Sequence, residues 1–154
     1  MIKGVYRYQG EDIREAHAIR REVFIEEQQI DPAEEYDEWD AKAIHGIVYD
    51  DEGAPCATAR LLLLDDGTFH IGRVAVRKCH RRKGYGDFIM RMMLDKAFLC
   101  GAQTVYIGAQ LQAIPFYESL GFCAYGEEYL DAGIPHRHMK VEKGEVTRAC
   151  GGHC

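Results

Sequence analysis

The feature that most constrains this chain is a basic, glycine-containing loop between an apolar strand and an amphipathic helix. The loop "RRKGYG" spans residues 81–86; the apolar stretch 71–76 precedes it, and apolar positions at helical spacing follow over 85–100. Unpaired amides at a helix N-terminus, the positive end of the helix dipole and nearby cationic side chains attract anions. Glycine also lets a ligand approach the backbone closely. The sequence therefore predicts a phosphate-binding turn at 81–86.

Two familiar phosphate-binding motifs do not account for this loop. The P-loop pattern G-x-x-x-x-G-K-[ST] does not occur in the chain. The dinucleotide fingerprint would need a third glycine at position 89, where the chain has Ile89. The loop therefore belongs to another class of phosphate site.

The hydrophobic periodicity of the whole chain predicts one domain of mixed α and β structure (α+β). Period-two or continuous apolar runs predict about seven strands, at 3–8, 42–50, 54–64, 68–76, 104–109, 123–130 and 136–142. Helical spacing predicts three or four helices, with the clearest at 11–24, 85–100 and 112–122. We place the domain at residues 1–145 and a flexible C-terminal tail at 146–154.

Composition excludes several classes of protein. The net charge is −6, and residues 26–40 hold eight carboxylates with no Lys or Arg, so the rest of the chain carries −6 + 8 = +2. This balance does not support a nucleic-acid-binding face. No apolar run approaches the roughly 20 residues that a membrane span needs, and residues 1–10 lack the apolar core of a signal peptide. A cytoplasmic protein is the simplest interpretation.

A metal site is not expected either. The tail residues Cys150, His153 and Cys154 are soft-ligand types. Three such residues around two glycines do not match the four-ligand spacings of structural zinc, so a disordered end is the preferred interpretation.

Two motifs together resemble the GNAT superfamily of acetyl-CoA-dependent N-acetyltransferases. The first is R-x-x-G-x-G at Arg81, Gly84 and Gly86, which follows "RVAV" at 73–76. The second is A-x-x-F-Y-x-x-x-G-F, which matches "AIPFYESLGF" at 113–122. With the strands and helices around them, the motifs cover residues 69–125. The resemblance implies a mostly antiparallel mixed sheet with flanking helices, whose two central strands splay apart to admit the cofactor.

The resemblance also implies how acetyl-CoA, as co-substrate, would lie. The pyrophosphate would rest on the loop amides, and the pantetheine arm would pair with the strand 74–76 as an added strand. The acyl group would then reach the centre of the sheet near Tyr117. The cofactor-binding residues that this implies are Val74, Ala75, Val76, Arg81, Arg82, Lys83, Gly84, Tyr85, Gly86, Gln110 and Phe116.

Tyr117 and His70 are the predicted catalytic residues. The phenol of Tyr117, protonated at neutral pH, could protonate the departing CoA thiolate; packing beside Phe116 is the alternative. Many relatives carry a Glu as general base on the strand before the loop, where this chain offers His70 and Gly72. Glu27, His138 and a water chain without a single base stay open as alternatives.

The expected reaction is acetyl transfer from acetyl-CoA to a primary amine by direct attack. Polyamines, aminoglycosides, amino sugars, amino acids and protein N-termini all stay open as acceptors, and a homodimer is compatible with this kind of sheet. An acyltransferase resembling the acyl-homoserine-lactone synthases and a non-catalytic acyl-CoA sensor are the alternatives.

Charged residues near the predicted acceptor side have two interpretations. Arg60 and Arg73 lie on predicted central strands, where pairing with carboxylates is preferred over facing the cleft. Most of the acidic segment 26–40 is expected to be a solvated face. Tyr36 and Trp39 within it could alternatively form an aromatic, anionic wall that suits a cationic amine.

Overall fold

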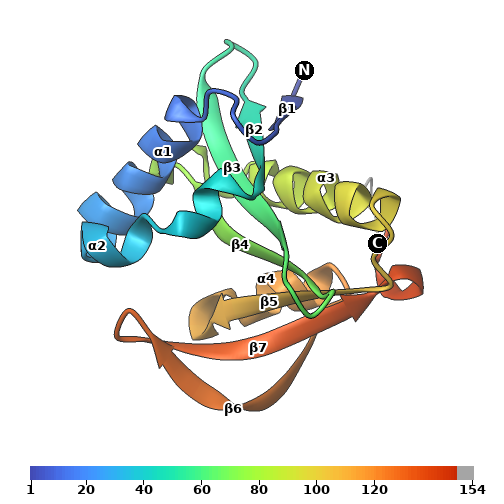
Figure 1. Cartoon of the computed structure of the whole chain (residues 1–154). Helices are drawn as coiled ribbons and strands as arrows, with labels where there is room; N and C mark the ends of the chain where they lie inside the picture. The colour runs from blue at the N-terminus through green and yellow to red at the C-terminus, as the bar shows by residue number, and fades with distance from the viewer. Residues whose placement is uncertain (149–154) are drawn as a thin grey trace.

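The computed structural model describes residues 1–148 and shows one seven-stranded sheet of order β1-β2-β3-β4-β5-β7-β6 (Figure 1). All neighbouring strands are antiparallel except β4 and β5, which are parallel. The mixed sheet with flanking helices confirms the predicted fold class. The strands are β1 (Lys3–Arg7), β2 (Ile44–Tyr49), β3 (Pro55–Leu63), β4 (Phe69–Val76), β5 (Thr104–Gln110), β6 (Cys123–Asp131) and β7 (Ile134–Glu142).

The sheet opens between its two parallel strands. β4 and β5 pair only at Phe69–Val105 and His70–Tyr106, although each strand continues for several residues beyond. Beyond this point β4 stays paired with β3, and β5 stays paired with β7. The two halves of the sheet therefore diverge, as the predicted splay requires.

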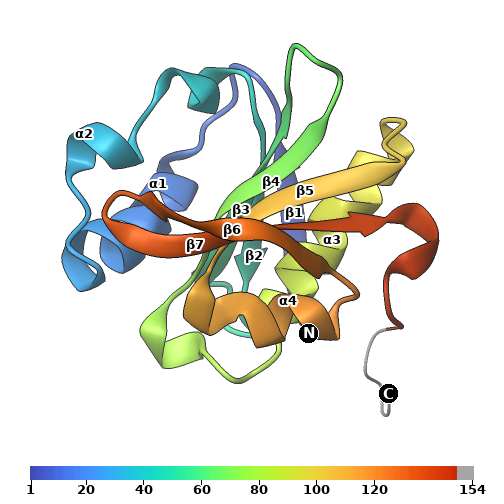
Figure 2. The same cartoon turned by 90° about the horizontal axis from the view of Figure 1, so that it is seen from below.

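Helices cover the two faces of the first half of the sheet (Figures 1 and 2). The helix α1 (Arg14–Arg20) continues as a π-helical turn η1 (Arg21–Glu27), and both pack their apolar side chains near β4. On the opposite face α3 (Tyr85–Leu99) packs its buried stripe on β2–β4 within the main core. The short helix α4 (Ile114–Ser119) packs beside β5 and β6.

Five short helical turns complete the described part of the chain. They are α2 (Pro32–Glu35) and the 3-10 turns η2 (Glu38–Ala41), η3 (Lys78–His80) and η4 (Leu111–Ala113), and a further 3-10 turn, η5 (Lys143–Glu145), follows β7. The α2–η2 segment lies over the edge of the opening between the sheet halves (Figure 1). It belongs to the acidic segment 26–40.

The first helix begins later and ends differently than its periodicity predicts. The side chain of Asp12 accepts the amide of Arg14 at 2.9 Å, so the chain turns before the helix begins. At its far end the amide of Gln28 donates to the carbonyl of Val23, a bond one residue wider than an α-helical one. This π-helical turn brings Glu27 and Gln28 to the opening of the sheet, where both line the cavity described below.

The C-terminal part of the described chain is tied to the domain. Thr147 donates its amide to Leu120 and its hydroxyl to the carbonyl of Ser119, and Val146 packs against the core. The remaining tail, with Cys150, His153 and Cys154, lies outside the described residues. Within residues 1–148, no helix is long and apolar enough to cross a membrane.

Candidate active site

The diverging strands β4 and β5 border a cavity of about 950 Å³. It runs from the basic loop before α3, past the opening of the sheet, to the face of β5, β7 and β6 that carries Gly108, His138 and Tyr129. All the predicted cofactor-binding residues on β4 and α4 line it, as do Tyr117 and His70. The fold thus brings the two sequence motifs, which begin at Arg81 and Ala113, to one cavity.

The loop at one end of the cavity presents an uncapped helix N-terminus. Gly84 is the N-cap of α3, has a φ of 89° and offers no side chain to the first-turn amides. The first helical bond, from the Phe88 amide to the Gly84 carbonyl, leaves the amides of residues 85–87 without an intrahelical acceptor. Arg82 also has a positive φ, 62°, so the loop backbone is bent to turn amides outward. This end suits an anion.

The three cations of the loop differ in their partners. Arg81 donates two hydrogen bonds to Glu27, at 2.7 and 2.6 Å, and a third to the carbonyl of Val76 at 3.0 Å. Arg81 therefore fastens the loop to η1 and β4 and is partly neutralised. Arg82 and Lys83 are exposed and make no ion pair within the described part of the chain.

A β-bulge lies on β4 next to the opening. The register runs from Thr58–Ala75 to Arg60–Gly72, so Arg73 and Val74 together face the single residue Ala59. Arg73 has a φ of 51°, which is uncommon for a non-glycine residue. The bulge leaves the backbone of 73–74 out of the regular ladder at the point where the cofactor arm would pass.

The side chain of Arg73 anchors this bulge to the acidic segment. Its Nε lies 2.9 Å from Glu35 Oε1, and its Nη2 lies 3.2 Å from Asp37 Oδ2. Its Nη2 also donates to the carbonyls of Glu34 and Glu35, each at 3.1 Å. Burial lowers the pKa of Arg73, and the neighbouring Arg60 lowers it further.

Three carboxylates of the acidic segment, Glu35, Asp37 and Asp40, bind buried arginines. Arg20 binds Glu35 and Asp40, and Arg60 binds Asp37 and Asp40, all within 3.0 Å. Arg20 and Glu35 are almost fully buried. Burial raises the pKa of Asp40, but hydrogen bonds and charge from the arginines outweigh it and hold that pKa well below its usual range.

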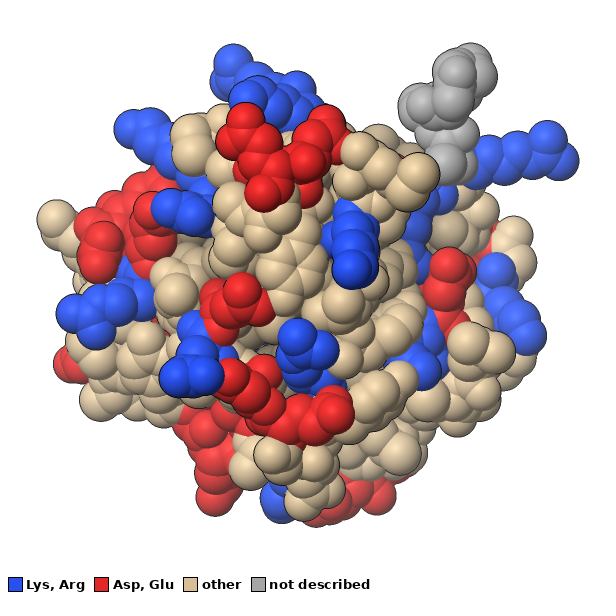
Figure 3. Space-filling model, turned by 90° about the horizontal axis from the view of Figure 1, so that it is seen from above, with Lys and Arg blue, Asp and Glu red and all other residues tan. Residues whose placement is uncertain are grey.

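These pairs confirm the preferred interpretation of Arg60 and Arg73, and they involve three of the eight carboxylates of the segment. The other five carboxylates of the segment, Glu26, Glu27, Asp31, Glu34 and Glu38, are exposed, so a solvated face describes most of it, as predicted. Acidic and basic side chains are likewise interspersed over the upper face of the molecule (Figure 3).

Tyr117 lies at the inner wall of the cavity. Its side chain is 8% exposed, and its ring packs against Phe116 and Phe122 at 5.1 and 5.9 Å between centroids. Burial raises the pKa of Tyr117, so the phenol keeps its proton at neutral pH. Phe116 also lines the cavity and lies 3.4 Å from the position of a Cβ on Gly86.

His70 lies on β4 just where the sheet opens, stacked on Tyr106 at 5.3 Å. Thr68 donates its hydroxyl hydrogen to Asp66 at 2.6 Å, so its oxygen must accept from His70 Nε2 at 2.9 Å. This network assigns the proton of a neutral His70 to Nε2 and leaves Nδ1 with a free lone pair. Burial lowers the pKa of His70, which keeps the imidazole neutral near pH 7.

The other candidates for the base occupy less suitable positions. Hydrogen bonds from Arg81 hold the pKa of Glu27 below its usual range, so its carboxylate is committed to an ion pair. His138 is exposed on β7 and stacks on Tyr129 at 4.3 Å. Gln110 lines the cavity and donates to Gln28 at 2.9 Å, which links β5 to η1.

Sequence reasoning missed a row of rings on the far side of the opening. The register of β5, β7 and β6 brings Tyr125 opposite His138 and Tyr129 opposite His136, on the face where Gly108 also lies. A Cβ on Gly108 would come within 2.3 Å of the Tyr129 hydroxyl, so the phenol lies directly over this glycine. The alternation of Tyr and His over 125–138 could have indicated one ring-lined face.

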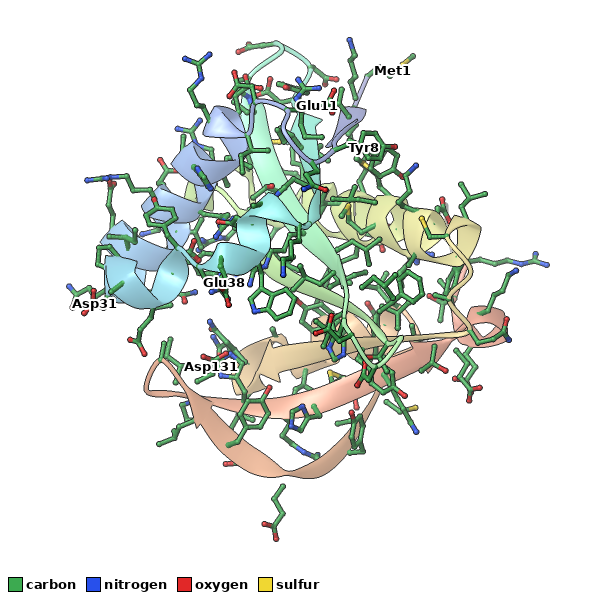
Figure 4. The ribbon with its side chains drawn as sticks, viewed as in Figure 1. Met1, Tyr8, Glu11, Asp31, Glu38 and Asp131 are labelled. Atoms are coloured by element: carbon green, nitrogen blue, oxygen red, sulfur yellow. The ribbon has the colours of Figure 1, made fainter. Side chains whose placement is uncertain are left out.

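Two carboxylates lie at the entrance of the cavity, where it adjoins β6 and α2, and neither has a cationic partner within residues 1–148. Glu34 on α2 and Asp131 at the end of β6 both line the cavity and an adjoining groove of about 530 Å³. Figure 4 shows Asp131 across the opening from the α2–η2 segment, where Asp31 and Glu38 are labelled. Trp39 lines the groove, whereas Tyr36 packs on His17 and Arg20. No group of metal-binding side chains occurs among the residues described.

Comparisons with known proteins agree with this geometry. The GNAT acetyltransferase domain matches residues 4–143. The uncharacterized N-acetyltransferase YjcF of Bacillus subtilis is 38% identical, over 90% of this chain and 98% of its own length. Among solved structures, Escherichia coli ElaA and an acyl-CoA N-acyltransferase from Pseudomonas aeruginosa each have a TM-score of 0.81 and 29% identity. Each alignment covers 92% of this chain and 99% or more of the other.

Proposed function

We propose that this chain, which belongs to the GNAT superfamily of acetyltransferases, transfers an acetyl group from acetyl-CoA to a small primary amine. The observation that carries the proposal is the cavity between the diverging strands, with an uncapped helix N-terminus at one end and Tyr117 at its inner wall. A membrane, a nucleic acid and a metal have no part in the reaction as we propose it.

The cofactor's pyrophosphate would accept hydrogen bonds from the amides of 82–86, with Arg82 and Lys83 free to add charge. Arg81 would act mainly by holding the loop through Glu27. The pantetheine arm would bind the open edge of β4 at 74–76, because its amides need partners once they leave water. Phe116 and Gln110 would flank the arm.

The transfer itself needs an acid, a base and a donor to the developing oxyanion. The neutral amine attacks the thioester carbonyl, so that an N–C bond forms and the C–S bond breaks. An amide of the β4 bulge at 73–74, which lies outside the regular strand register, would stabilise the oxyanion. Tyr117 donates a hydrogen bond and then its proton to the leaving thiolate. His70 Nδ1, with its free lone pair, takes the proton that the amine loses.

The acceptor that suits this site best is an amine with an additional positive charge. Glu34 and Asp131 lie at the mouth without a cationic partner in the described chain, and negative charge there raises the local concentration of cations. The electrostatic support is weaker than the eight carboxylates of 26–40 imply, because five of them pair with arginines: Glu26, Glu27, Glu35, Asp37 and Asp40.

An amine library assayed with acetyl-CoA, with free thiol as the readout, tests this function. We expect thiol release that depends on the amine, together with an equal amount of acetylated product. Acyl-CoA donors of increasing chain length, assayed in parallel, separate acetyl transfer from the long-chain transfer of the acyl-homoserine-lactone synthases. Donor binding without any amine-dependent release would indicate the acyl-CoA sensor.

A further inference from the structure

Cys79, His80 and Asp50 form a hydrogen-bonded chain that the acetyl-transfer chemistry does not use. The Sγ of Cys79 lies 3.2 Å from Nδ1 of His80, and Nε2 of His80 lies 2.8 Å from Oδ2 of Asp50. Cys79 and His80 belong to η3, and Asp50 directly follows β2. None of the three is among the residues that line the cavity.

The surrounding structure fixes this arrangement. Oδ1 of Asp50 accepts the amides of Glu52 and Ala54, each at 2.9 Å, which leaves Oδ2 for His80. The ring of His80 packs edge-on against Tyr85 at 5.6 Å. The side chains of His80 and Asp50 are only 16% and 14% exposed. The imidazole is thus held from two sides and directed at the thiol.

The hydrogen bonds of His80 fix the tautomer in which Nδ1, the nitrogen next to the Cys79 thiol, can act as a base. A carboxylate only accepts, so the neutral ring donates Nε2–H to Asp50, and Nδ1 is left to accept the S–H of Cys79. The hydrogen bond from His80 lowers the pKa of Asp50, which keeps this carboxylate ionised at neutral pH. His80 is therefore placed to take the thiol proton as the sulfur attacks, which is how an adjacent base activates a cysteine.

The other described cysteines lack this environment. Cys100 and Cys123 are exposed as Cys79 is, but neither has a hydrogen bond to a histidine in the part of the chain that the structure describes. Cys56 is buried, and burial raises the pKa of its thiol to about 11. The chain therefore contains its own matched controls for the reactivity of Cys79.

We propose that Cys79 is a modification site that exchanges with small disulfides. The Cys79 sulfur attacks one sulfur of the disulfide, so that a new S–S bond forms and the old one breaks. Its proton passes through His80 to the leaving thiolate, which departs as a free thiol. The exposed cations Lys78, on η3, and Arg82 and Lys83, in the loop that follows, favour anionic disulfides. The adduct would lie beside the loop assigned to the cofactor.

Oxidised glutathione is a suitable probe, with peptide mapping by mass spectrometry after timed quenching. We expect Cys79 to be modified at least about tenfold faster than Cys100 and Cys123. His80→Gln keeps a donor for Asp50 but removes the base. Asp50→Asn keeps the turn but donates to Nε2, which forces the proton onto Nδ1. Each variant should bring the rate at Cys79 to within about twofold of Cys100.

Equal rates at Cys79, Cys100 and Cys123 in the unchanged protein would overturn the proposal. A fast rate that survives both substitutions would also overturn it, because exposure alone would then explain the reactivity. Cys56 reports folding, since it should stay unmodified while the core is intact. If Cys56 is modified in a variant, that variant is not folded and is set aside. The relative modification rates of Cys79, Cys100 and Cys123 in the unchanged protein then decide whether the proposal holds.

Discussion

The guanidinium of Arg73 binds the carboxylate of Glu35, with 2.9 Å between Nε and Oε1, and so ties the bulge of β4 to the α2–η2 segment. The bulge needs this anchor because Arg73 has a φ of 51°, a conformation that costs a non-glycine residue about 1–3 kcal/mol. The acidic segment thereby holds the backbone amides to which we assign the oxyanion.

Substitutions at Arg73 should separate backbone strain from anchoring. Arg73→Ala loses the anchor and keeps the strain, whereas Arg73→Gly loses the anchor and relieves the strain. We expect the melting temperature to fall more for alanine than for glycine, and kcat to fall in both, with a smaller change in the KM for acetyl-CoA. An unchanged kcat in Arg73→Gly would show that the anchor does not position catalytic groups.

A methyl group at Gly86 should obstruct the cofactor without unfolding the domain. A Cβ there meets only ordinary contacts with Phe116 and Val76, unlike one at Gly84, whose φ of 89° would strain any substitution. We expect Gly86→Ala to weaken acetyl-CoA binding at least about tenfold by calorimetry, since its amide must approach the pyrophosphate closely. Gly144→Ala, in open space on η5, is the matched control. Equal affinities would move the cofactor away from this loop.

Removal of the Tyr117 hydroxyl should affect turnover rather than binding. Tyr117→Phe keeps the ring contacts with Phe116 and Phe122 and deletes the proton donor. General acid catalysis is typically worth about 10²–10⁴-fold, and we expect a loss in kcat of this order. A loss smaller than about threefold, under about 1 kcal/mol of barrier, would place the proton source elsewhere.

The pH dependence of kcat should report His70. Its pKa is lowered by burial from the usual 6.5, so the imidazole becomes a competent base as the pH rises through a value below 6.5. Activity should therefore fall only on the acid side of that value, and His70→Gln should remove this limb and lower kcat. A pH profile unchanged by the substitution would dismiss His70 as the base.

The carboxylates at the mouth should favour cationic acceptors. We expect the double variant Glu34→Gln/Asp131→Asn to raise the KM for polyamines or aminoglycosides. The KM for neutral amines should stay nearly unchanged. The preference should weaken with salt, because exposed charges are screened over about 8–10 Å. Glu38→Gln, a charge change away from both cavities, is the control. Equal KM values for neutral and cationic amines at low salt would contradict the assignment.

The end of the candidate site formed by the loop 81–86 and α4 could be predicted from sequence, and most of the end formed by β5, β7 and β6 could not. The glycines of 84–86 and the segment 113–122 act through local geometry, so short motifs describe them. The β5–β7–β6 end is different, because strand register and the path of α2 alone bring its residues to the same cavity. These residues include Gly108, Tyr129 and Glu34. The acidic composition of 26–40 likewise does not predict which cations its carboxylates bind. Their partners Arg20, Arg60 and Arg73 lie on other elements.

Initial rates measured against both substrates test the central claim most directly. With the best acceptor from the amine screen, acetyl-CoA and amine are varied together, and thiol and acetylated amine are both quantified. The account predicts intersecting double-reciprocal lines and equal amounts of the two products, because the amine attacks the thioester within one ternary complex. Parallel lines, or thiol release that does not depend on the amine, would contradict it.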